Sequence, residues 1–404
     1  MSPRPGCSTC WGDGDARDLL SHTDEWIATA TAQRWPHSEP TFGPIATAGG
    51  ALYRQVRAGG VALCATVRPA GRTLSRLVRG DRGDLATVLA DANGDAATAI
   101  AGQAEQLTAL AAYTRLWVAS PIACAQGVMF TPWEDGATLA ARLRARPREF
   151  TGVMTALMDD LSDLHRNPPA QLSEAAATTR VLPRVVAEAL SHPVDHLHAD
   201  DTTAGEIGEL RALAGSLSTR LGRLATQLDP MLLSRGGIAF GNLNPRGVLY
   251  PEGSSRAVLV SPALEPGGDL VDTGTLLGHL YLLIFGCPPP VRAELVDGVE
   301  AWLSGRLAAS RDHWRDWLHA VLTVWAATVY DQAITTLTLP AVALRLGPTA
   351  ADPPAPPLAA LSGLDALTRE LRRRGAGAAL NAALAALADS PADRPARQLD
   401  SADH

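Results

Sequence analysis

The chain has 404 residues, 46% of them hydrophobic, and a formal net charge of −7; all 35 of its Lys+Arg positions are arginine. This acidic balance argues against a general nucleic-acid binder, which needs a basic face, and no apolar run reaches the ~20 residues that span a bilayer. Five cysteines without a secretion signal favour a reducing, cytoplasmic location. Neither nucleic acid nor membrane is therefore an expected partner.

The first third of the chain combines helices with β-rich segments. Gly59-Gly60 lies between two alternating apolar runs, and glycine reaches the positive φ that tight hairpins need. A connector over Thr131–Gly136 ends this region because its proline and glycine interrupt the pattern. The predicted strands are Ala51–Val56, Val61–Val67, Val118–Ala123 and Gly127–Phe130. The predicted helices, from apolar residues at helical spacing, are Ala16–Arg34 and Ile100–Tyr113.

The remainder of the chain is mainly helical. Gly237–Val260 is the exception and predicts two short β segments around a polar loop. Residues 167–205 have the composition of a surface insertion, residues 351–357 that of a stiff proline-rich linker, and residues after Ser390 that of a disordered tail. The predicted helices are Thr138–Arg146, Phe150–Arg166, Glu206–Leu228, Thr273–Phe285, Val291–Leu307, His313–Leu337 and Ala360–Arg374.

These elements predict a two-lobed α+β fold. An N-terminal extension covers residues 1–40, a β-rich N-lobe 41–132 and a helical C-lobe 133–345. A linker, C-terminal helices and a disordered tail make up 346–404. The ligand cleft is expected between the lobes, because pockets favour domain junctions.

The polar loop carries the most specific pattern in the chain. Phe240-Gly-Asn-Leu-Asn-Pro-Arg-Gly-Val-Leu249 resembles the catalytic loop His-Gly-Asp-Leu-x-Pro-x-Asn-Val-Leu of the aminoglycoside phosphotransferase-like kinases. Val258-Leu-Val-Ser-Pro-Ala263 is similar to the metal-binding Ile-Asp-Pro segment of that family, and Met129–Leu139 to its hinge. The likeness covers residues 45–340 or so, and it is nearest to phosphotransferase-like proteins of actinomycete natural-product clusters. It implies a protein-kinase-like fold, with a small β-rich N-lobe and a large helical C-lobe.

The resemblance also identifies positions where catalytic groups are replaced. The loop aspartate that serves the family as general base is Asn242 here, and a neutral amide has no basic lone pair. The two metal ligands of the family are replaced by Gly247 and Ser261, whereas magnesium prefers carboxylates. The phosphate-anchoring lysine of the N-lobe aligns with Thr66. No catalytic residue, metal or cofactor is expected at these positions, because phosphoryl transfer depends on positioning and on charge neutralisation.

A few family residues remain. Glu105 corresponds to the usual partner of the missing lysine, and Asp272 stands at the start of the apolar helix that follows the loop. The vestigial nucleotide cleft is expected to be lined by Glu105, Met129, Asn242, Asn244 and Ser261.

These losses predict a pseudokinase that holds a partner. The cluster-type resemblance implies a binding, scaffolding or activating subunit, in a hetero-oligomer with a partner enzyme or with a precursor peptide, in ribosomal-peptide (lanthipeptide-type) biosynthesis. Two alternatives stay open. An unconventional phosphotransferase would use arginines for phosphate, and Glu265 or Asp269 for metal, to modify a peptide Ser/Thr or a small-molecule hydroxyl. A small-molecule binding protein would hold an aminoglycoside-like ligand.

Other features have simpler interpretations. Cys7 and Cys10 are interpreted as an incidental pair because a zinc site needs four ligands. Aromatic residues at helical spacing over His313–Tyr330 favour core packing, with a partner groove as the minority interpretation. A solvated loop, rather than a transition-metal site, is favoured for the following group: His192, His196, His198, Asp200 and Asp201. An acidic patch at the mouth of the cleft is a further hypothesis for Glu265, Asp269 and Asp272.

Overall fold

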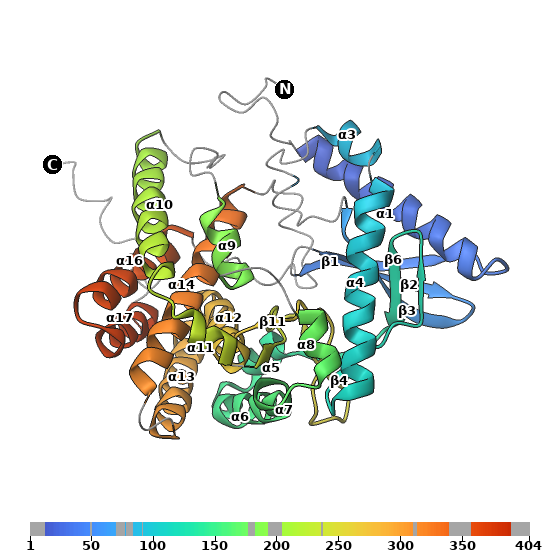
Figure 1. Ribbon diagram of the computed structural model, residues 1–404. Coiled ribbons are helices and arrows are strands. Elements are labelled where there is room, and N and C mark those ends of the chain that lie inside the picture. The colour runs from blue at the N-terminus through green and yellow to red at the C-terminus, as the bar shows by residue number, and fades with distance from the viewer. Residues whose placement is uncertain are drawn as a thin grey trace.

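The computed structural model describes residues 13–48, 51–69, 77, 84–90, 92–176, 182–192, 204–235, 237–309, 313–338 and 357–388. They form a small β-rich N-lobe, blue in Figure 1, and a larger helical C-lobe, green to red, with helix α4 (Ala92–Tyr113) between them. The predicted two-lobed α+β fold is confirmed. Several predictions fall outside the described residues: the Cys7–Cys10 pair, the polar residues 196–201, the linker 351–356 and the tail after Ser390.

The N-lobe is built on an antiparallel sheet with the strand order β1-β2-β3-β6-β5. Gly59 and Gly60 have φ values of 58° and 80° and close the β2–β3 hairpin, in which Ala58 pairs with Val61. The predicted hairpin is therefore confirmed. The strands are β1 (Thr41–Ala48), β2 (Ala51–Ala58), β3 (Val61–Val67), β5 (Ala123–Ala125) and β6 (Val128–Pro132).

Helices cover the N-lobe sheet. They are α1 (Asp13–Arg34), the short α3 (Leu85–Ala90) and α4. On α1, Trp26 donates from Nε1 to the carbonyl of Gln126 at 2.6 Å, beside the edge strand β5. Trp26 and Ile27 share a buried cluster with Val128 and Phe130. The N-terminal helix thus belongs to the core of the N-lobe, although the sequence assigned it to an extension.

The segment between α4 and β6 passes from one lobe to the other. Its first strand, β4 (Trp117–Val118), pairs in parallel with β10 (Val258–Leu259) in the C-lobe, and its second strand, β5, pairs with β6 in the N-lobe. The prediction of one strand over Val118–Ala123 is wrong. Pro121 lies between the two strands and has no backbone N–H for a ladder, so the chain changes sheets there.

The C-lobe contains two small sheets and most of the helices. One sheet has the order β4-β10-β9-β7, and the other pairs β11 with β8. The remaining strands are β7 (Gly136–Thr138), β8 (Ile238–Ala239), β9 (Val248–Pro251) and β11 (Glu265–Pro266). The helices are α5 (Leu139–Ala145), the 3₁₀ turn η2 (Pro147–Glu149), α6 (Phe150–Asp160), α7 (Ser162–Arg166), α8 (Ala170–Ala176), α9 (Arg184–Leu190), α10 (Ala204–Ala225), α11 (Pro230–Arg235), α12 (Gly268–Phe285), α13 (Pro289–Ala309), α14 (Trp314–Thr338), α16 (Pro357–Arg373) and α17 (Ala376–Ala388).

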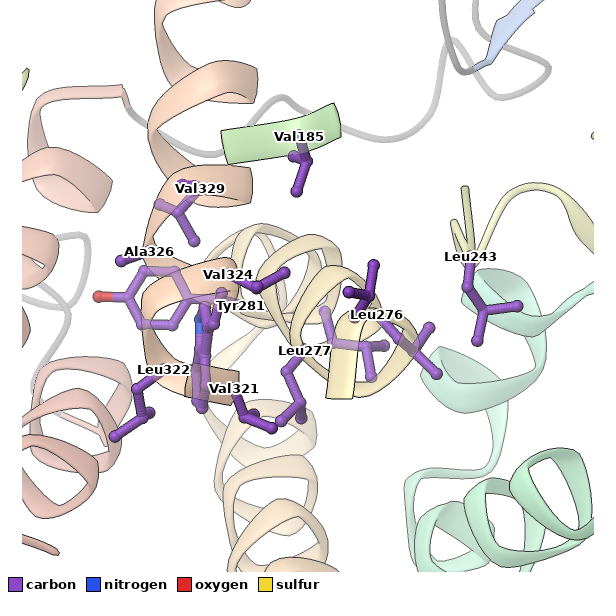
Figure 2. Packing of buried hydrophobic residues seen from close by; sticks show 14 of the residues in the cluster. Val185, Leu243, Leu276, Leu277, Tyr281, Val321, Leu322, Val324, Ala326 and Val329 are labelled. Atoms are coloured by element: carbon purple, nitrogen blue, oxygen red, sulfur yellow. The ribbon is translucent and has the colours of Figure 1, made fainter. Parts of the chain in front are cut away.

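Helices α12 and α14 form the centre of the C-lobe. Figure 2 shows Leu277 and Tyr281 of α12 next to side chains of α14, whereas Leu276 lies on the side of α12 towards Leu243. Val185 of α9 lies near α14 in the same view. Tyr281 and Trp325 make an edge-to-face contact with ring centroids 5.9 Å apart. Trp325 and Tyr330 are fully buried, which places this part of the aromatic stripe in the core as predicted.

Two parts of the C-lobe differ from the sequence prediction. The single helix predicted over Phe150–Arg166 is divided at Leu161 into α6 and α7. The region predicted as a surface insertion contains α9, whose residues Val185, Val186 and Ala189 are buried in the main core. A short run of apolar residues in a polar context gave too little periodic signal for a helix prediction. No helix in the described part of the chain is long and apolar enough to cross a membrane.

The C-terminal helices are integral to the C-lobe. Arg220 of α10 donates from Nη2 to the Asp365 carboxylate at 2.6 Å and from Nη1 to the Thr368 hydroxyl at 3.2 Å, both on α16. Leu364 and Leu371 of α16 lie in the same hydrophobic cluster as α12 and α14. The predicted domain boundary near residue 345 therefore divides the helices of the C-lobe from α16, although α16 packs against them in the same core.

Candidate functional site

The loop that resembles a catalytic loop is held in place by a buried aspartate. Asp272, on the first turns of α12, has no exposed surface and accepts hydrogen bonds from the backbone N–H groups of Phe240 at 2.7 Å and Gly241 at 2.9 Å. Nε2 of His165 lies 2.9 Å from the same carboxylate. Gly241 has a φ of 80°, and a Cβ there would come within 1.9 Å of the Ala263 carbonyl oxygen. The loop geometry is thus strongly determined.

Asn242 and Ser261, predicted as degenerate positions, are brought together at the centre of the site. The Asn242 amide donates to the Ser261 carbonyl at 3.2 Å and lies 3.4 Å from its hydroxyl oxygen. Asn242 is 9% exposed and Ser261 is 3% exposed. Where the kinase-like pattern has two carboxylates, this pair is neutral and its donors and acceptors are directed at each other.

Gly247 and Asn244 complete the loop. Gly247 donates to the Asn244 carbonyl at 2.8 Å, and the Asn244 side-chain oxygen accepts from the Arg246 backbone N–H at 2.9 Å. A Cβ at Gly247 would meet the Asn244 carbonyl oxygen at 3.5 Å, which is an ordinary contact. The backbone therefore does not require glycine at this position. The Cβ of a side chain that could bind a metal ion would fit there without a steric clash.

The residues of this loop do not fit a magnesium ion. Asn242, Gly247 and Ser261 offer an amide, no side chain and a hydroxyl, whereas Mg²⁺ is ordinarily held by one or two carboxylates. Among the described residues, no group of three His, Cys, Asp or Glu is arranged to hold a metal ion. The loop keeps its shape without the charges of a metal centre.

On the N-lobe side, the inward-facing cation is Arg68. Thr66, aligned with the family lysine, is buried in β3 and pairs with Tyr53 and Met129. Arg68 follows two residues later, and alternate residues of an extended chain share a face. Its Nε donates to the Gln103 side-chain oxygen on α4 at 3.1 Å. An arginine–glutamine pair thus lies where the resemblance placed Glu105.

Glu105 lies on the opposite side of α4 from this pair. It is exposed and lines a shallow groove of about 460 Å³ with Tyr113, Ile122 and Cys124. The predicted placement of Glu105 in the nucleotide cleft is not what the structure shows, because two residues along a helix turn a side chain by about 200°. Met129 is 1% exposed and packs against Ile100 and Leu107 of α4.

A chain of polar contacts connects the lobes. Gln103 receives the Arg68 hydrogen bond, and its amide nitrogen lies 3.4 Å from the Ser261 hydroxyl, which in turn contacts Asn242. The Tyr53 hydroxyl is buried in the same region, and burial raises the pKa of Tyr53 despite the nearby Arg68 charge. The space between β3, α4 and the loop is therefore crossed by the protein's own side chains.

Helix α9 covers the other side of the loop. Arg184 donates from its backbone N–H to the Glu265 carboxylate at 2.6 Å and from Nη2 to the Gly241 carbonyl at 3.1 Å. Its Nη1 lies 3.2 Å from Glu188. At the other end of α9, His192 is buried and Nε2 lies 2.6 Å from Asp331, so this histidine is not part of a solvated loop. The helix is thus anchored to the loop at one end and to α14 at the other.

The hypothesis of an exposed acidic patch is wrong. Glu265 is 5% exposed and Asp272 is fully buried. Asp269 accepts from Arg306 and from Trp317 Nε1. Each of the three carboxylates accepts at least one internal hydrogen bond, and Oε1 of Glu265 is buried with no partner among the described residues.

Sequence reasoning missed Arg68, Gln103 and Arg184. The alternation of β3 was a usable signal for Arg68, since positions 66 and 68 share a face. Gln103 depends on the rotation of α4 against the sheet, and Arg184 lies in a segment with a weak helical pattern. Neither could be placed without tertiary packing.

Two buried groups near the loop predict opposite pH dependences of stability. Burial raises the pKa of Glu265 from 4.5 to about 7, against the attraction of Arg184, and burial lowers the pKa of His279 from 6.5 to about 4. The folded state holds the Glu265 proton more tightly than the unfolded state does. The contribution of Glu265 to the free energy of unfolding is therefore full below pH 4.5 and is lost as pH rises to 7. The His279 contribution is full above pH 6.5 and is lost as pH falls towards 4.

Urea unfolding at pH 8 and pH 5 separates these contributions. Relative to wild type, Glu265→Gln is expected to lose about 2 kcal/mol of unfolding free energy on going from pH 8 to pH 5, and His279→Gln to gain about 2 kcal/mol. Because the two effects oppose each other, the wild-type profile should be nearly flat. Parallel pH profiles for all three proteins would contradict the assignment.

Comparison with known proteins gives a fold likeness only. No known family model and no curated protein matches the chain. Its structure is similar to Plasmodium vivax ethanolamine kinase, at 9% identity over 83% of this chain and 83% of that one, with a TM-score of 0.42. It is also similar to a thermostable mutant of aminoglycoside phosphotransferase APH(4)-Ia, at 10% identity over 89% and 98% of the chains and a TM-score of 0.43. A third similar structure is APH(3'')-Id from Streptomyces rimosus, at 16% identity over 78% and 100%, with a TM-score of 0.40. At such low identities, residue roles follow from the geometry of this chain.

Proposed function

We propose that the chain is a pseudokinase that serves as a non-catalytic binding, scaffolding or activating subunit for a partner enzyme or a precursor peptide. The pathway we propose is the biosynthesis of a ribosomally made natural product in which Ser/Thr residues are dehydrated. One observation carries the proposal. Asp272 holds the loop at Phe240 and Gly241, while Asn242 and Ser261, at the positions of the general base and a metal ligand in the kinase-like pattern, are neutral and hydrogen-bonded to each other.

The two halves of this observation have different physical meanings. A buried carboxylate that accepts backbone donors stabilises a fold whether or not chemistry occurs. A general base and a metal site need charged or basic groups directed at the substrate. Asn242 and Ser261 supply neither. The hydrogen bonds that hold the loop are present, but the groups that phosphoryl transfer needs are not present at Asn242 and Ser261.

Phosphoryl transfer assays provide the direct test. Purified protein with ATP and Mg²⁺ or Mn²⁺ is expected to show no transfer to peptide, small-molecule hydroxyl or water above background. The Asn242→Asp, Ser261→Asp double variant is also expected to be inactive, because the site still lacks a lysine. An active kinase at matched concentration sets the detection limit. Turnover at an ordinary enzyme rate by the wild-type protein would overturn the proposal.

The partner is identified by affinity purification of the tagged full-length chain from its native host. A partner enzyme or a short precursor peptide should co-purify in a defined stoichiometry. In the reconstituted mixture, the partner's rate or its affinity for the peptide should increase when the chain is added. Unchanged partner kinetics at saturating concentrations of the chain would argue against an activating role.

A second candidate function is an arginine-based phosphotransferase, and Arg68 favours it because its guanidinium joins the polar contacts that reach Ser261 and Asn242 through Gln103. Its proposed metal ligands are less suitable. Glu265 accepts from Arg184, and Asp269 from Arg306 and Trp317. The assays above test this candidate directly. An aminoglycoside-binding role, the third hypothesis, would appear as a thermal shift with aminoglycoside and none with ATP.

A further inference from the structure

The polar residues of the cleft have an unusual charge balance. Three side chains at its centre are neutral: Asn242 and Ser261 on the C-lobe side and Gln103 on α4. The first two stand where the kinase-like pattern has carboxylates. The nearest carboxylates of α12, at Asp269 and Asp272, are occupied by internal donors. The negative charge that would bind a metal ion and repel a free phosphate is absent from these positions.

Positive charge is nevertheless present. Among the described residues, Arg68 donates its hydrogen bond from Nε to the side-chain amide of Gln103, and this uncharged partner does not neutralise the guanidinium. A glutamate at the same place would form an ion pair. Burial lowers the pKa of Arg68, and so does the nearby positive charge of Arg184, whereas Tyr53 and the Glu188 carboxylate act in the opposite direction. Arginine keeps its charge at neutral pH even so.

Arg184 contributes from the opposite side of the loop. Its charge is shared with Glu188 at 3.2 Å. Glu265, its other neighbour, has a pKa raised to about 7 by burial and so carries only part of its charge at neutral pH. Nε of Arg184 is buried and has no hydrogen-bond partner among the described residues. Arg68, with its neutral partner, is thus the primary anchor, and Arg184 adds to the positive field.

We propose that the cleft binds a phosphate group directly on Arg68, without a divalent metal ion. This inference rests on the proposed loss of transfer chemistry. The planar guanidinium presents paired donors that match a phosphate. Magnesium finds no carboxylate ligand at Asn242, Gly247 or Ser261. A magnesium ion on the phosphates would reduce their charge towards Arg68, so magnesium should weaken binding, whereas an active kinase site requires it.

Titration calorimetry and thermal shift with defined probes test this proposal. The probes are sodium pyrophosphate, ATP with EDTA, ATP with excess Mg²⁺, and O-phosphoserine. At least one metal-free probe should bind and raise the melting temperature, and excess Mg²⁺ should weaken ATP binding severalfold. The probes also separate the sources of the phosphate. Pyrophosphate alone indicates a free anion, a preference for ATP indicates a nucleotide, and a preference for O-phosphoserine indicates a phosphorylated peptide.

Two variants and one control assign the binding to Arg68. Arg68→Gln should weaken the metal-free probe at least tenfold. Gln103→Glu should also weaken it about tenfold, because the new carboxylate pairs with Arg68 while the packing at position 103 is kept. Gln103→Glu serves as the test even if Arg68→Gln folds poorly. Arg57→Gln, an exposed arginine of the neighbouring strand β2, is the matched control and should bind like wild type.

The outcomes separate this inference from the proposed function. If none of the metal-free probes binds, or if binding requires Mg²⁺, the inference is overturned, while the pseudokinase proposal stands as long as no turnover is seen. Wild-type affinity in both Arg68→Gln and Gln103→Glu would also overturn it. Turnover of Mg-ATP, in contrast, would overturn the proposed function itself.

Discussion

Replacing Asp272 with alanine is expected to lower the free energy of unfolding by about 4 kcal/mol or more, since it strands several buried donors at about 1–3 kcal/mol each. These donors are the N–H groups of Phe240 and Gly241 and the His165 ring. The aspartate is fully buried, so water cannot replace it without rearrangement. Urea unfolding followed by circular dichroism measures the effect.

The design includes a conservative variant and a control. Asp272→Asn keeps the size of the side chain but places an amide donor opposite the other donors, so it should recover little of the loss. Asp297→Ala, an exposed carboxylate on α13, should change stability by less than about 0.5 kcal/mol. A nearly wild-type Asp272→Asn would mean that packing, and not hydrogen bonding, holds the loop.

Trp325→Ala is expected to cost about 3–5 kcal/mol, the usual range for removing a large aromatic from a core. Trp325 of α14 is 1% exposed, and its edge-to-face contact with Tyr281 of α12 joins the two helices. Its Nε1 has no hydrogen-bond partner within the described residues, so the loss comes from packing alone. Because α12 also carries Asp272, the cavity is expected to loosen the loop as well.

Trp117→Ala is the matched control for this prediction. Trp117 is 46% exposed, and its main interaction is the Arg256 guanidinium, 4.7 Å from the ring centroid. Such an exposed cation–π contact contributes about 0.5–1 kcal/mol. Equal losses for the two tryptophan variants would show that the α12–α14 interface is less central than the structure indicates.

Periodic and turn signals were sufficient for much of the fold. The β2–β3 hairpin follows from Gly59-Gly60, and the long helices α10, α12, α13 and α14 lie close to their predicted ranges. Each of these helices has many residues that follow one apolar spacing, and apolar residues at this spacing are buried in the structure. Strand β1 was not predicted, because Gly43-Pro44 interrupts its alternation and the register shifts between Phe42 and Ile45.

The site was predictable where it lies within one loop and its neighbouring strand. Asn242 and Ser261 meet because β8, β9 and β10 bring their segments together, as the resemblance implied. Glu105 was misplaced because a motif alignment does not determine which face of α4 meets the sheet. The Arg68–Gln103 pair joins residues from a strand and a helix 35 positions apart, and no local pattern specifies such a contact.

The docking of α16 against α10 affects how the protein is made. The Arg220–Asp365 contact joins residues 145 positions apart, and at translation rates of ~5–20 residues per second the second partner follows the first after roughly 7–30 s. Until then, the apolar surfaces of α10 and α14 that α16 covers have no native partner, which exposes the nascent chain to aggregation. Expression at lower temperature or with added chaperones should therefore raise the soluble yield of full-length protein.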